Sequence, residues 1–152
     1  MPARPGARFT SVIVHPKVWL AVNEPSDTVT VTAAGVLDAA ARTASGSGTF
    51  QHRNAHGVLL ASGSFAITGL TTFVPYGCQT DGLVVCGGRA LLPIHITGHP
   101  ASGGTVQLDG VLTVTCALGN APAGAREGVK VNVQDVINFN RSTEGETVFV
   151  RH

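Results

Sequence analysis

Charged side chains are scarce in this sequence. Asp, Glu, Lys and Arg make up 12% of its 152 residues, about half the usual share in a soluble domain. Ten basic side chains against nine acidic ones leave a formal net charge of +1, and no basic run occurs. Nucleic-acid binding is therefore not predicted, because it requires clustered Lys and Arg. The low charge favours a surface of Ser, Thr and Gly, or one partly covered by contacts between subunits.

Several sequence signals of function are also missing. No apolar run approaches the roughly 18 residues that a membrane helix needs. The opening segment, "MPARPGARFTSVIV", lacks the apolar core of a secretory signal, so both a cytoplasmic and an extracytoplasmic location stay open. No P-loop, Rossmann fingerprint, nucleophile elbow or kinase signature occurs, so no cofactor is predicted. One Trp and one Tyr offer few platforms for carbohydrate.

No window has the 3.6-residue period of an amphipathic helix; the nearest, "GVLDAAARTA", also fits a strand with a bend. The dominant pattern is alternation with period two, punctuated by Gly and Pro. In "GGTVQLDGVLTVTCAL", for example, one face carries Val106, Leu108, Leu112, Val114 and Cys116, and the other carries Thr and Asp residues. Such alternation predicts half-buried β-strands.

Eight strands are predicted, at residues 9–22, 27–38, 43–52, 57–74, 84–97, 104–118, 128–134 and 146–151. Their regular spacing predicts an all-β fold: a single-domain, antiparallel, eight-stranded barrel over residues 9–152, preceded by a flexible N-terminal segment, residues 1–8. A β-sandwich is the alternative. A barrel is favoured because it leaves no edge strand unpaired.

Four segments of the chain resemble a group of small all-β bacterial proteins of unassigned function. They are "GTFQHRNAHGVLLASGSF", "FVPYGC", "LDGVLTVTCALGNAPAGAREGVKVNV" and "INFNRSTEGETVFV", which together cover roughly residues 48–150. The resemblance implies an all-β fold and transfers no catalytic motif. A bacterial source also agrees with the eight arginines against two lysines and the abundance of Ala, Gly and Val.

The histidines form two pairs with a spacing of four residues. Along a strand, His95 and His99 stand about 13 Å apart, too far for one metal ion. His52 and His56 flank a hairpin turn and are the weak metal candidates, but no Asp, Glu or Cys near them in sequence supplies a third ligand. Solvent-facing or hydrogen-bonded histidines are the favoured interpretation, and no metal site is predicted.

The chain has three cysteines, which lie in two different contexts. Cys78 and Cys86 flank a loop between strands and are candidates for a disulfide, which the unknown redox compartment leaves open. Cys116 lies on the apolar face of a strand and is predicted to be a buried thiol.

Six polar residues are candidates for a shared site: His52, Arg53, Tyr76, Arg89, His95 and Asp109. If they converge at the mouth of a barrel, they would suit an anion clamp or an acid–base pair around a small organic molecule. The competing interpretation is that each caps a strand or faces water.

Three functions are compatible with these observations. The first is a non-catalytic β-barrel that binds an apolar small molecule or self-associates. The second is a cofactor-independent cyclase or isomerase, which requires a deep cavity lined by Tyr76, Arg89 or Asp109. The third is an oligomeric interaction module, with Phe9, Ile13 and Trp19 as its contact patch.

Overall fold

Extended backbone dominates the structure, a computed structural model that describes residues 8–13, 17–21, 27–79, 84–125, 127–134, 136–144 and 147–151. These residues contain eleven β-strands and no helix. The strands are β1 (Arg8–Ile13), β2 (Lys17–Ala21), β3 (Thr28–Asp38), β4 (Thr43–Arg53), β5 (Leu59–Ile67), β6 (Thr72–Gln79), β7 (Val85–Pro100), β8 (Val106–Cys116), β9 (Gly128–Val133), β10 (Ile137–Glu144) and β11 (Thr147–Arg151).

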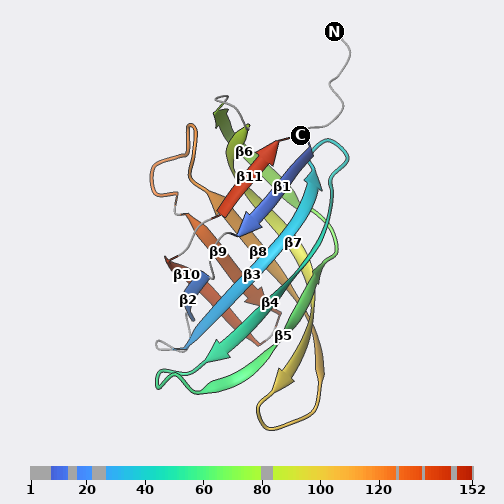
Figure 1. The fold of residues 1–152 in the computed structure, drawn as a ribbon, viewed down its shortest axis with the longest axis vertical. Helices are drawn as coiled ribbons and strands as arrows, with labels where there is room; N and C mark the ends of the chain where they lie inside the picture. Colours follow the sequence, from blue (N-terminus) through green and yellow to red (C-terminus); the bar gives the residue numbers. More distant parts are fainter. Residues whose placement is uncertain are drawn as a thin grey trace.

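Every pair of neighbouring strands is antiparallel, and all eleven belong to one sheet. The order in the sheet is β1-β11-β7-β5-β4-β3-β2-β10-β9-β8, with β6 paired to β7 and with two additional pairings, β1–β3 and β7–β8. The sheet curves strongly, and Figure 1 shows β3, β4 and β5 in front of β8 and β9. The predicted all-β, antiparallel class is confirmed.

The predicted number of eight strands is too low. The segment predicted as one strand at 9–22 contains β1 and β2, and the one predicted at 57–74 contains β5 and the start of β6. The sequence predicts a loop at "NRSTEGE", yet residues 140–144 of this segment belong to β10. Pairing with β9 and β2 satisfies backbone hydrogen bonds of β10. The sequence pattern within β10 does not reveal this pairing. The other predicted strands agree with β3, β4, β7, β8, β9 and β11 to within three residues at each end.

The β3–β4 hairpin sets the register on which the site depends. Its turn lies within "GVLDAAARTA", a sequence that fits either a helical turn or a strand with a bend. There the Asp38 carboxylate accepts hydrogen bonds from the backbone N–H groups of Ala40 and Ala41, and Arg42 adopts a left-handed φ of 56°. Residue pairing then runs without a shift from Asp38–Thr43 to Thr28–Arg53.

One face of the sheet forms the hydrophobic core. Alternate residues of β3, β7, β8 and β9 are buried against one another, and their neighbours face outward, as the period-two pattern predicts. The largest side chains that are almost completely buried are Phe149, Leu112, Val31, Val114 and Val129.

Two glycines allow close packing between β5 and β7. Gly63 on β5 lies opposite Gly98 on β7, and a Cβ atom at Gly63 would lie 2.0 Å from the Thr97 carbonyl oxygen. The ring of Phe50 lies close to both glycines. A side chain is therefore excluded at Gly63, and a Cβ atom at Gly98 would lie 3.1 Å from Cγ2 of Val106.

Two predictions about the N-terminal part fall largely outside the described residues. Of the segment 1–8 predicted to be flexible, the structure describes Arg8, which begins β1. The side chains of Phe9, Ile13 and Trp19, the predicted contact patch, also lie outside the description, although their strands are placed.

Candidate functional site

An apolar cavity of about 150 Å³ lies within the core, lined by residues of β3, β4, β5, β7, β8, β9 and β10 and of the β9–β10 turn. Its walls are mostly branched aliphatic and aromatic side chains, among them Val29, Val31, Phe65, Ile94, Ile96, Val131 and Val133. Val106 and Val136 also line it, yet they are 40% and 59% exposed. The cavity therefore opens to solvent between β8 and the β9–β10 turn.

His52 is the one polar side chain among the described residues that line this cavity. Its Nε2 atom lies 2.8 Å from Oδ2 of Asp27, and the two side chains are only 20% and 15% exposed. The imidazole also meets the ring of Phe139 edge to face, with the ring centroids 5.3 Å apart. Asp27 and Phe139 thus hold the imidazole of His52 in one orientation at the cavity wall.

The hairpin register explains why these residues meet. His52 lies directly opposite Val29, so Asp27, which precedes β3 by one residue, is its diagonal neighbour on the same face. Sequence reasoning identified His52 and missed Asp27, because the two are 25 residues apart. Counting back from a tight turn after Asp38 would have revealed the pair.

Two other candidates from the sequence, His95 and Asp109, also meet, but on the outer face of the sheet. They are directly opposite on β7 and β8, with His95 Nδ1 2.9 Å from Asp109 Oδ1, and their side chains are 46% and 73% exposed. His95 Nε2 lies 2.7 Å from Oε1 of Gln107, which also accepts a hydrogen bond from the Thr97 hydroxyl. The hydrogen bond to Asp109, followed by that to Gln107, raises the pKa of His95 above its ordinary value.

Arg53 and His56 belong to the β4–β5 hairpin and not to the cavity. Arg53 donates hydrogen bonds to the Gly57 carbonyl and to Oε1 of Gln51, so it lies on the face opposite to His52. The backbone N–H of His56 donates to Oδ1 of Asn54, and its side chain is exposed. Among the described residues, no group of three or more His, Cys, Asp or Glu is placed to hold a metal ion.

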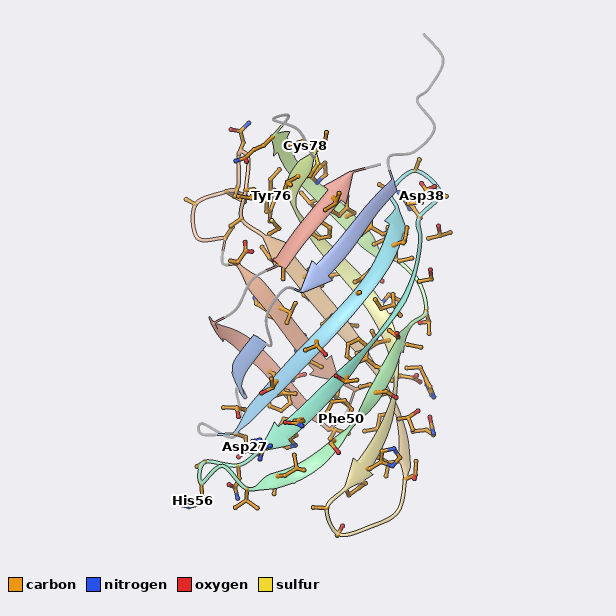
Figure 2. The ribbon with its side chains drawn as sticks, viewed as in Figure 1. Asp27, Asp38, Phe50, His56, Tyr76 and Cys78 are labelled. Carbon is orange, nitrogen blue, oxygen red and sulfur yellow. A yellow bond between two sulfur atoms is a disulfide. The ribbon has the colours of Figure 1, made fainter. Side chains whose placement is uncertain are left out.

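Tyr76 and Arg89 are distant from the cavity wall. Figure 2 shows Tyr76 beside Cys78 near one end of the molecule, whereas Asp27 lies toward the other end. Arg89 is exposed and lies opposite Thr115 on β8. The six candidate residues therefore do not converge: His52 lines the cavity, His95 and Asp109 form an outer pair, and the remaining three lie elsewhere.

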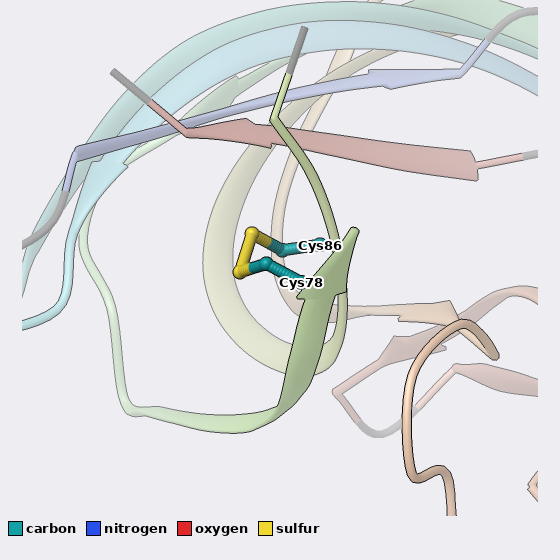
Figure 3. The surroundings of a disulfide bond; sticks show 2 residues. All are labelled: Cys78 and Cys86. Atoms are coloured by element: carbon teal, nitrogen blue, oxygen red, sulfur yellow. A yellow bond between two sulfur atoms is a disulfide. The ribbon is translucent and has the colours of Figure 1, made fainter. Parts of the chain in front are cut away.

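Cys78 and Cys86 form a disulfide between directly opposed residues of β6 and β7 (Figure 3). It closes the hairpin whose loop the two cysteines flank. Cys116 is completely buried and remains a thiol, in agreement with its position on the apolar face of β8.

No protein-family model matches the chain, and neither a curated protein nor a solved structure matches it. The resemblance to small bacterial all-β proteins therefore stays a prediction. The described part of the chain contains no apolar helix of membrane-spanning length.

Proposed function

We propose that this protein is a non-catalytic β-barrel that binds a small apolar molecule in the cavity beside His52. The observation that carries the proposal is the cavity itself, of about 150 Å³, with an almost wholly apolar lining and exposed valines at its mouth. Apolar cavities of about this volume bind benzene. Such a ligand gains free energy from leaving water and from filling space that the side chains leave empty.

The barrel is supported by the circuit of strand pairings around this cavity. Pairings lead from β7 to β8, β9, β10, β2, β3, β4 and β5 in turn, and β5 pairs with β7 again. That circuit contains eight strands, but it includes β10 and omits β11, so it differs from the predicted set of eight. A β-sandwich would divide the strands between two sheets, whereas here all eleven belong to one.

Titration with benzene tests the proposed function, with the methyl NMR signals of Val131 and Ile96 as the readout. Ala61 lines the cavity opposite His52, so Ala61→Leu fills part of the space. We expect benzene to shift the methyl signals of the wild type, and Ala61→Leu to weaken its binding at least tenfold. Ala66→Leu is the matched control, because Ala66 is exposed on the same strand. It should bind benzene like the wild type.

Two results would contradict the proposal. One is a wild type whose methyl signals do not respond to benzene. The other is a folded Ala61→Leu variant that binds benzene as well as the wild type does, because binding would then lie outside the cavity.

A cofactor-independent isomerase or cyclase is the second candidate, and the Asp27–His52 pair favours it. An imidazole held by a carboxylate is suited to proton transfer. However, none of Tyr76, Arg89 and Asp109, the residues predicted to serve such an enzyme, is among the described residues that line the cavity. A binding protein leaves its ligand chemically unchanged. If the wild type converts a bound ligand to a product and His52→Phe does not, the isomerase or cyclase is favoured.

A further inference from the structure

The pairing with Asp27 determines which His52 nitrogen carries the hydrogen. An ionised carboxylate only accepts hydrogen bonds, so Nε2, 2.8 Å from Asp27 Oδ2, must carry a hydrogen and donate it. In the neutral imidazole the other nitrogen, Nδ1, is then a hydrogen-bond acceptor. Within the described part of the chain, the hydrogen-bond partner of the His52 ring is Asp27, bound through Nε2. His52 lines the cavity, and Nδ1 is the ring nitrogen that Asp27 does not bind.

We propose that the ligand carries one hydroxyl group, which donates a hydrogen bond to Nδ1 of His52, on a body no larger than one aromatic ring. This inference rests on the proposed binding function and specifies the chemical class of the ligand. Phenols and compact alcohols have this chemistry. The other described lining residues present only hydrocarbon side chains or a glycine, so a second polar group on the ligand would be buried without a side-chain partner.

The charge of the pair argues for a neutral ligand. Asp27 contributes a carboxylate beside the imidazole, and both side chains are largely withdrawn from water. A ligand carboxylate would approach this negative charge where water screens it poorly, and it would also lose its own hydration. A hydroxyl group avoids both costs and fills the acceptor position of Nδ1.

The size of the cavity limits the rest of the ligand. At about 150 Å³ it matches the volume that accommodates benzene. Phenol is therefore a suitable probe, and fluorobenzene is its matched control, because it has nearly the same shape but no hydrogen to donate.

The test measures the dissociation constants of phenol and fluorobenzene for the wild type and for His52→Phe, by calorimetry or by NMR titration. Phe retains an aromatic ring against Phe139 and removes the acceptor. We expect His52→Phe to weaken phenol binding about tenfold, the factor for one hydrogen bond supported by a charged group, and to change fluorobenzene binding less than twofold. Asp27→Asn should weaken phenol binding by a smaller factor, because the amide oxygen still accepts from Nε2.

The outcomes separate this inference from the proposed function. If neither compound binds the wild type, the binding function itself is wrong. If fluorobenzene binds but phenol binds the wild type and His52→Phe equally well, the cavity binds ligands and the hydroxyl recognition is wrong. Should His52→Phe fail to fold, the wild type decides, and phenol that binds it no more tightly than fluorobenzene overturns the inference.

Discussion

At the scale of single residues, two histidine–aspartate pairs differ in their exposure to solvent. His52 and His95 both pair with an aspartate, at 2.8 Å and 2.9 Å respectively. The first pair lies at the wall of an apolar cavity and the second lies in contact with solvent. The same residue types therefore form a pair at an apolar cavity in one place and a surface hydrogen-bond network in the other.

The outer pair leads to a prediction about pH. Both ring nitrogens of His95 lie against acceptor oxygens, which favours the protonated imidazolium and explains the raised pKa. Because the pKa of His95 in the folded state lies above 6.5, the stabilisation that its protonated ring contributes is fully present below about pH 6.5. This contribution is lost as the pH rises through the raised value.

An NMR titration of the His95 ring measures this effect directly. We expect its midpoint above that of a histidine in an unfolded peptide, and we expect Asp109→Asn to lower it. Gln107→Ala should lower it less, because the hydrogen bond to Gln107 is the smaller cause. A wild-type midpoint at the ordinary value would show that the two contacts do not persist in solution.

At the scale of elements, the disulfide stabilises the end of the β6–β7 hairpin. The link between Cys78 and Cys86 closes a loop of nine residues. The chain-entropy model assigns such a loop a stabilisation of about 2.5 kcal/mol, through the restriction of the unfolded chain. We expect the double variant Cys78→Ala/Cys86→Ala to lose a free energy of unfolding of this size in urea.

Reduction of the wild type provides the control. The wild type in excess dithiothreitol should unfold at the same urea concentration as the double variant, since Cys116 is present in both proteins. Equal stability of the oxidised and reduced wild type would contradict a stabilising role of the disulfide.

At the scale of the whole molecule, Glu127 ties together segments that are far apart in the chain. Its Oε1 accepts a hydrogen bond from the backbone N–H of Ala117, just after β8, at 2.7 Å. Its Oε2 accepts one from the backbone N–H of Thr147, the first residue of β11, at 2.9 Å. The buried hydroxyl of Thr147 lies within hydrogen-bond distance of Oε2 and of the Thr115 carbonyl oxygen. Glu127 therefore holds β11 against the end of β8.

We expect Glu127→Gln to lower the free energy of unfolding by about 2 kcal/mol, the usual contribution of hydrogen bonds to a charged group. The amide nitrogen of Gln must face an N–H donor on one side, so at least one of the bonds is lost in either orientation. Lys130→Gln, which removes one charge at an exposed position of β9, should leave stability nearly unchanged. Equal urea midpoints for the two variants would disprove the role assigned to Glu127.

The sequence alone determined the features that depend on alternation along one strand. It predicted the all-β class, the buried and exposed faces of β8, and the buried position of Cys116. It also placed His95 and Asp109 on polar faces, because whether a side chain points inward depends only on its position in a period of two.

Only the tertiary structure decided which strands lie side by side. It identified β10 as a strand, brought Asp27 to His52, and brought together the apolar residues that line the cavity. It also separated Tyr76 and Arg89 from His52. The physical reason is that register and strand order arise from hydrogen bonds and packing between residues far apart in the chain, which a local pattern does not encode.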